Sequence, residues 1–216
     1  MKVLVFDTET TGLPKQKGIP AKQAPGNWPH IVSISWVMME DDIVIDTQSF
    51  IVRPDGWEIP LDSTAIHGIT HAQAVKVGYS LDFVMDKFTK QYYDIMIAHN
   101  MEFDENVVAN AMYWDLGRKN FLGLPPIKKC SMRESQSICK LPSQYSGFKP
   151  PKLSELYKYV FGTTPVMAKL HNSLYDVEVL VRILQTSPEL RNKLGLTKSP
   201  LIKYNDRQTK PNVLRL

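Results

Sequence analysis

The stretch Val3–Leu13, "VLVFDTETTGL", decides how the rest of the sequence is interpreted. An apolar run that breaks at a Thr-Thr-Gly turn is typical of a strand from the middle of a sheet. Asp7 and Glu9 lie two residues apart near its end, and side chains at this spacing on a strand point the same way. Adjacent carboxylates repel each other, so each favours a bound proton unless a cation lies nearby. The stretch therefore predicts a buried strand whose end needs a positive charge nearby, from an Arg, a Lys or a metal ion.

The composition is that of an ordinary soluble domain. The chain has 216 residues, of which 43% are hydrophobic and 22% are charged, and this length suffices for one domain with its own core. No apolar run approaches the roughly 18–20 residues of a membrane span, and the start of the chain lacks a signal-peptide pattern. Cys130 and Cys139 show no metal-site spacing, which favours a reducing compartment. We therefore expect a cytoplasmic protein with no membrane partner.

The net charge of +4 conceals an asymmetry between the two halves of the chain. Residues 1–117 contain 8 Lys and Arg against 16 Asp and Glu, whereas residues 118–216 contain 18 against 6. Two differently solvated surfaces would explain this equally well as an acidic metal pocket beside a basic surface that holds a polyanion.

The hydrophobic pattern predicts alternating strands and helices after an initial hairpin. Residues 31–39 and 43–52 are expected to pair as antiparallel strands, and residues 14–30, rich in Pro, Gly and Lys, are expected to form a mobile basic loop. This order indicates an α/β domain over residues 1–197 with a mixed sheet covered on both faces, followed by a loosely packed basic extension, 198–216. A short helix is predicted within residues 59–70, opened by Asp62 or Ser63 and closed near Gly68. Further helices are predicted at 81–93, 101–117, 132–139, 153–161 and 174–184, and short strands at 94–100 and 127–130.

Two more carboxylates occur at the ends of predicted elements. Asp104 lies about one turn into a helix that follows a short strand, with Asn100 as its expected N-cap. Asp176 lies in the first turns of the last long helix, and His171 precedes that helix. Each Asp alone could be an ordinary helix residue. Together with the strand pair they would form an all-oxygen site suited to two Mg²⁺ or Mn²⁺ ions, beside an imidazole able to take a proton from water near pH 7.

Four motifs occur in the order of a known family. The segments "FDTETTGL", "HGIT", "AHNMEFD" and "HNSLYD" resemble those of DnaQ-like 3′→5′ exonucleases of the DEDD superfamily, similar to the epsilon proofreading subunit of bacterial replicative polymerases. The resemblance covers roughly residues 2–186. It implies a ribonuclease H-like fold, with a five-stranded mixed sheet and helices on both faces.

The resemblance also implies roles for individual residues. It makes Asp7, Glu9, Asp104 and Asp176 the metal ligands and His171 the general base, five residues before the last Asp as in the DEDDh branch. Taken singly, the implied substrate contacts have ordinary explanations as a turn glycine, a core aromatic or a helix-end histidine. The implied contacts are Thr10, Thr11, Gly12, Leu13, His67, Gly68, Asn100 and Phe103.

The expected activity is hydrolysis of the terminal phosphodiester at a 3′ end, with two divalent cations, Mg²⁺ or Mn²⁺, and release of nucleoside 5′-monophosphates. The expected partner is nucleic acid with a free 3′ end, DNA rather than RNA, and a polymerase or repair protein would be needed for proofreading. The alternatives are an exoribonuclease and a catalytically silent nucleic-acid-binding subunit. The basic residues expected to follow the strand, unless they form a merely solvated face, are Lys128, Lys129, Arg133, Lys140, Lys149 and Lys152.

Overall fold

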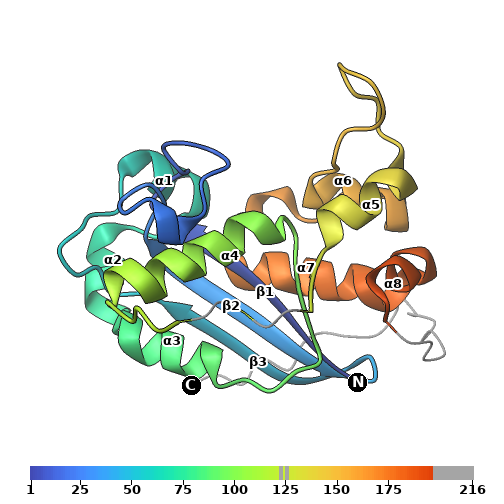
Figure 1. Cartoon of the computed structure of the whole chain (residues 1–216). Coiled ribbons are helices and arrows are strands. Elements are labelled where there is room, and N and C mark those ends of the chain that lie inside the picture. The colour runs from blue at the N-terminus through green and yellow to red at the C-terminus, as the bar shows by residue number, and fades with distance from the viewer. Residues whose placement is uncertain (122–123, 125–126, 197–216) are drawn as a thin grey trace.

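The computed structural model describes residues 1–121, 124 and 127–196, and these form an α/β fold (Figure 1). Its strands are β1 (Lys2–Thr10), β2 (Ile31–Glu40), β3 (Ile43–Ile51), β4 (Ile95–Ala98) and β5 (Lys128–Cys130). Its helices are α1 (Leu61–His67), α2 (His71–Val77), α3 (Leu81–Thr89), α4 (Met101–Asn110), α5 (Ser131–Cys139), α6 (Leu153–Phe161), α7 (Ser173–Thr186) and α8 (Pro188–Leu194). Short 3₁₀ turns occupy Ala21–Gln23 and Met167–Lys169, and a π-helical turn, Ala111–Asp115, continues α4.

The five strands form one mixed sheet in the order β3-β2-β1-β4-β5. Strands β1, β2 and β3 are antiparallel neighbours, whereas β4 pairs with β1 and β5 in parallel. The predicted hairpin and the predicted mixed sheet are thus confirmed. Strand β1 lies at the centre, so side chains at its carboxyl end can meet groups from both faces.

Each face of the sheet carries its own hydrophobic core. Leu4 and Phe6 of β1 face a core shared with α3 and α4, which contains Trp36. Val3 and Val5 face the other core, which is shared with α5, α6, α7 and α8 (Figure 1). The alternation of side chains along β1 therefore assigns every second residue to one helical layer.

Several helix boundaries differ from those predicted. Helix α1 begins after Pro60, and its N-cap is neither Asp62 nor Ser63. Helix α3 ends at Thr89 rather than at residue 93, and Tyr92 is 77% exposed because it no longer lies on the buried stripe. The short helices α2 and α8 were not predicted, because seven residues are too few for a clear period.

The loop 14–30 is anchored, contrary to the expectation of a mobile segment. Trp28 is only 8% exposed and donates its indole N–H to the Ile19 carbonyl at 2.8 Å. Ala21 bonds to α4 and its extension, accepting from the Trp114 indole at 2.8 Å and donating to Asn106 Oδ1 at 2.8 Å. Tertiary contacts of one aromatic and one small residue thus outweigh the loop-like composition.

Residues 198–216, the predicted basic extension, lie outside the described residues. In the part of the chain that is described, no helix combines the length and the hydrophobicity needed to cross a bilayer.

Candidate active site

The carboxyl end of β1 supplies two acids on one face of the sheet. Asp7 and Glu9 continue the row of Val3 and Val5, so they point toward the layer of helices that includes α7. Glu9 is 8% exposed, and Asp7 is half-buried. Burial and the repulsion between like charges therefore both disfavour the ionised forms of Asp7 and Glu9.

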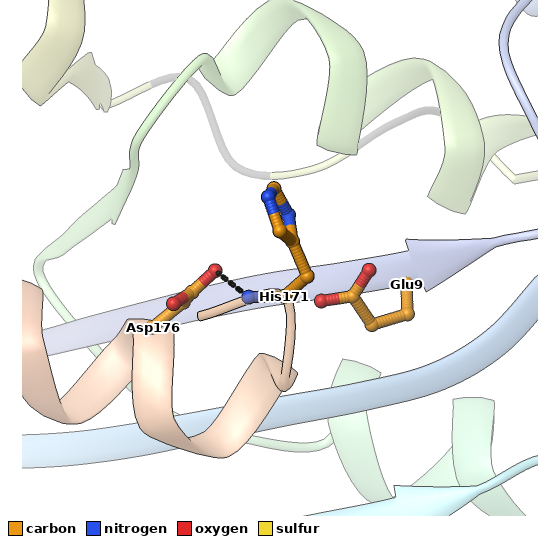
Figure 2. Close-up of side chains that lie close together, drawn as sticks. All are labelled: Glu9, His171 and Asp176. Carbon is orange, nitrogen blue, oxygen red and sulfur yellow. Dashed lines mark hydrogen bonds between the residues drawn. The ribbon is translucent and has the colours of Figure 1, made fainter. Parts of the chain in front are cut away.

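Helix α7 brings Asp176 and His171 to the same place. The side chain of Asn172 caps the helix by accepting from the Tyr175 N–H at 3.1 Å. The backbone N–H of His171 donates to Asp176 Oδ2 at 3.2 Å, and His171 adopts a left-handed conformation with φ 63°. Figure 2 shows the carboxylates of Glu9 and Asp176 on either side of His171. One ligand atom from each of these three residues lies within 4.8 Å of the others.

Asp104 reaches the site from the opposite face of the sheet. Its Oδ1 accepts from the Thr8 hydroxyl at 2.7 Å and from the Thr8 N–H at 3.1 Å. The backbone N–H is available because the pairing of β1 with β4 extends only to Val5. Asp104 is 2% exposed, which is tolerable for a carboxylate only with such partners. Thr8 was not predicted as a functional residue, and no local pattern marks it.

Asn100, in contrast, does not cap α4 with its side chain as predicted. It occupies the N-cap position in a left-handed conformation, φ 88°, and its side chain makes no capping hydrogen bond. The turn instead directs Asn100 toward the cavity beside the acids.

The four carboxyl groups share an unusual electrostatic environment. Burial, followed by the charges of Asp104, Glu9 and Asp176, raises the pKa of Asp7 well above its ordinary value. Burial raises the pKa of Glu9 to about 8 and that of Asp104 to about 7, although the Thr8 hydrogen bonds partly offset the shift of Asp104. Burial also raises the pKa of Asp176 to about 6, against the effect of the His171 N–H.

This donor set fits divalent cations. Among the described residues, no Lys or Arg forms an ion pair with any of the four acids. Asp176 Oδ1 is buried and lacks a hydrogen-bond partner within the described chain, so this oxygen is available as a ligand. Carboxylate oxygens are the ligands that Mg²⁺ and Mn²⁺ prefer. The tightest group of ligand atoms contains His171 rather than Asp7 or Asp104.

A cavity of about 400 Å³ opens beside the acids. Its wall includes six of the eight predicted substrate contacts. Thr11 is not among them, because its hydroxyl accepts from the His30 N–H at 3.0 Å, and Gly68 instead lines a neighbouring cavity of about 620 Å³. Ser63 and Ile66 of α1 line the first cavity although the sequence did not point to them. The predicted residues in this wall are Asp7, Glu9, Thr10, Gly12, Leu13, His67, Asn100, Phe103, His171 and Asp176.

The sequence matches a known family over most of its length. Residues 4–184 match the exonuclease family RNase_T. The chain belongs to this family. It is a phosphodiester hydrolase related to DnaQ-like 3′→5′ exonucleases, as the four motifs implied.

Solved structures of exonucleases share the fold of this exonuclease domain. Exonuclease X in complex with 5′-overhanging duplex DNA is 25% identical, with a TM-score of 0.54, and the match covers 89% of this chain and 99% of that chain. The zinc-bound complex of Escherichia coli exonuclease I with single-stranded DNA is 18% identical, with a TM-score of 0.64 and coverage of 88% and 42%. Exonuclease I from Methylocaldum szegediense is 14% identical, with a TM-score of 0.63 and the same coverage of 88% and 42%. No match was found among curated protein sequences.

Two further histidines of the exonuclease, His67 and His99, have separate environments. His67 is 7% exposed, and its Nδ1 accepts from the Ile69 N–H at 3.1 Å, so its other ring nitrogen carries the proton when the ring is neutral. Burial lowers the pKa of His67, which favours that neutral form. His99 bonds to Ser131 and to the Pro151 carbonyl, and burial lowers its pKa to about 4, as suits a structural residue.

The basic residues expected to bind a strand are partly neutralised within the exonuclease. Lys128 pairs with Glu105, and Arg133 pairs with Glu102, on the outer face of α4. Lys149 pairs with Glu155 at 2.6 Å. The charge asymmetry of the sequence therefore overstates the free positive charge on this surface.

Proposed function

We propose that the domain is a two-metal 3′→5′ exonuclease that removes nucleoside 5′-monophosphates from the 3′ end of DNA. Asp7, Glu9, Asp104 and Asp176 would hold the two divalent cations. The observation that carries the proposal is the convergence of these acids from β1, α4 and α7 with raised pKa values and no basic partner among the described residues. When bound, such cations polarise the phosphodiester and neutralise charge on the departing 3′ oxygen.

His171 is the general base in this proposal. Its side chain is exposed at the edge of the cavity, where water has access. A neutral imidazole takes a proton from the attacking water, and the resulting hydroxide forms a bond to the terminal phosphorus while the bond to the preceding 3′ oxygen breaks. The His171 N–H bond to Asp176 ties the position of the base to that of one proposed ligand. The products are a nucleoside 5′-monophosphate and a strand shortened by one residue with a free 3′-hydroxyl.

The cavity beside the acids would accept the terminal nucleotide. Leu13, 75% exposed, stands at its mouth, and Phe103 offers an aromatic surface against which a base can pack. A volume of about 400 Å³ lies within the range of small-molecule sites, roughly 300–1,000 Å³. The DNA complexes of exonuclease X and exonuclease I favour DNA over RNA as the substrate.

A panel of 5′-labelled substrates tests the proposal. Single-stranded DNA should be shortened stepwise from its 3′ end with Mg²⁺ or Mn²⁺, and EDTA or the substitution Asp7→Asn should stop the reaction. Glu102→Gln, which removes an exposed acid of α4 that pairs with Arg133, is the matched control and should remain active. Equal activity of wild type and Asp7→Asn would overturn the proposed site.

The same panel decides the substrate and the biological role. Faster digestion of RNA of identical sequence would leave the proposed site residues unchanged but would make RNA, not DNA, the substrate. A clear preference for a mismatched over a paired 3′ end would support proofreading with a polymerase partner, whereas equal rates would indicate general trimming.

A further inference from the structure

Four serine hydroxyls form a hydrogen-bonded chain beneath the first turn of α7. Ser173, the first residue of α7, lies 3.0 Å from Ser33 and 2.8 Å from Ser35, measured between hydroxyl oxygens. Ser35 donates in turn to Ser49 on β3 at 2.9 Å. Ser33, Ser35 and Ser173 are 4%, 0% and 3% exposed, so these hydroxyls have been removed from water.

Each serine hydroxyl has one proton to donate, and this fixes the donor and the acceptor of every hydrogen bond along the serine chain. A serine hydroxyl donates one hydrogen bond. Because Ser35 donates to Ser49, it must accept from Ser173, and Ser173 must then accept from Ser33. Every buried hydroxyl is satisfied in this one arrangement, and removing a central member leaves its neighbours unpaired at a cost.

The serine chain connects α7 to β2 and β3, and β2 pairs with β1, the strand that carries Asp7 and Glu9. In the register of β1 and β2, Ser33 lies opposite Glu9 and Ser35 lies opposite Asp7. Ser173 is two residues after His171 and three before Asp176. The hydroxyls thus form directional bonds between the start of α7 and the strand beside Asp7 and Glu9.

Most of the rest of this interface is aliphatic, and one further polar contact lies near the far end of α7, where Gln185 donates to the Asp42 carbonyl at 2.8 Å. Val5 and Val37 of the sheet share a core with Val177, Leu180 and Leu184 of α7. The aliphatic contacts are non-directional, so by themselves they do not fix the position of the first turn of α7 on the sheet. Serine also has the smallest polar side chain, which lets the start of α7 approach β2 closely.

We propose that Ser173, held by Ser33 and Ser35, is a positioning residue that sets His171 and Asp176 against Glu9. This inference rests on the proposed function, in which those three residues act on metal and water. The alternative is that the serines only fill a polar gap in the core. The two explanations differ in what happens to catalysis when a hydroxyl is removed.

The decisive experiment compares Ser173→Ala with Ser135→Ala. Ser135 is 0% exposed and bonds at 2.6 Å to the Ser131 carbonyl within α5, so its variant also loses one buried hydroxyl, but away from the site. For each variant we would measure kcat, KM, the pH–rate profile, thermal stability and Mn²⁺ affinity by titration calorimetry. We expect Ser173→Ala to lower kcat and Mn²⁺ affinity by about tenfold to a hundredfold, as for residues that orient metal ligands, with KM little changed. Ser135→Ala should lose stability alone.

A double-mutant cycle sharpens the test. Ser35→Ala should reproduce part of the Ser173→Ala effect and add little to it in the double variant, because the two residues share one bond. The inference is overturned if Ser173→Ala matches Ser135→Ala in kcat, pH profile and Mn²⁺ affinity, or if the two serine effects are additive. A wild-type protein without nuclease activity would instead overturn the proposed function, and the Mn²⁺ affinities would still test the serine chain.

Discussion

The two faces of strand β1 each lie against a helix that supplies a carboxylate to the proposed site, but the contacts to that carboxylate differ. On one side Leu4 and Phe6 lead to Thr8, which bonds Asp104 of α4. On the other side Val3 and Val5 lead to Asp7 and Glu9, which face α7. Both rows begin in a hydrophobic core and end at a carboxylate from a distant helix.

Asp104 and Asp176 are held by different numbers of hydrogen bonds. Asp104 Oδ1 receives two hydrogen bonds from Thr8, a residue of the central strand. Asp176 receives one, from the backbone of His171, and its other oxygen lacks a partner among the described residues. The position of Asp104 therefore follows the sheet directly, whereas that of Asp176 depends on the segment before α7 and on the serine chain beneath it. His171, the proposed base, lies on the side with fewer hydrogen bonds to its carboxylate.

Replacing Asp104 or Asp176 should cause the largest loss of activity. We expect Asp104→Asn and Asp176→Asn each to lower kcat by about 10³-fold or more, because a bound metal supplies several kcal/mol of transition-state stabilisation. Single-turnover digestion of labelled DNA measures this loss, with Glu102→Gln on α4 as the control. A loss of less than tenfold for one variant would restrict the metal site to the other side of β1.

Removing the base should have the next largest effect. We expect His171→Ala to reduce kcat by roughly 10²–10⁴-fold while Mn²⁺ affinity stays within a fewfold of wild type. If Mn²⁺ affinity falls as far as in Asp176→Asn, then His171 acts as a ligand, consistent with its place in the tightest group of ligand atoms.

The raised pKa values predict how stability depends on pH without metal. Burial raises the pKa of Glu9 from 4.5 to about 8, so the folded protein binds more protons than the unfolded chain within this window. The free energy of unfolding should therefore be greatest at the acid end of this window and fall as the pH rises toward 8. Asp104, with a pKa of about 7, and Asp176, with a pKa of about 6, should contribute to the same fall at lower pH.

Metal should offset that loss of stability. We expect Mg²⁺ or Mn²⁺ to raise the melting temperature more at pH 8 than at pH 6, since the ionised acids are then uncompensated. At roughly 2–4 °C per kcal/mol for a protein of this size, calorimetry in EDTA and in metal resolves the difference. An equal increase at both pH values would contradict the assigned environment of Glu9.

The smallest effect is expected from the hydroxyl that holds Asp104. Thr8→Val keeps the shape of the side chain and leaves the backbone N–H bond in place, so only one of two hydrogen bonds is lost. We expect Mn²⁺ affinity to fall by about tenfold, at the low end for residues that orient ligands. Thr8→Ser, which keeps the hydroxyl, should stay close to wild type. Equal behaviour of the two variants would show that the strand backbone alone positions Asp104.

Much of the fold was predictable because its signals are local. The apolar run of β1, the hairpin of β2 and β3, and the helical period of α7 all lie within short windows of sequence. The acids and the histidine could be predicted because the four motifs of the family are short and occur in order. Local patterns failed where they were brief, as in α2 and α8, or where composition suggested a free loop at residues 14–30.

By itself, the sequence determined the class of fold, the family and the residue types of the site. Only the tertiary structure decided which contacts hold these residues in place. Thr8 forms a hydrogen bond with Asp104, which is 96 residues away in the sequence, and Ser33 forms one with Ser173, which is 140 residues away. It also decided that Lys149 is paired with Glu155 and that Thr11 turns away from the cavity. The bonds of Thr8 and Ser33 depend on packing between distant elements, and a short polar residue looks the same in the sequence whether or not a partner reaches it.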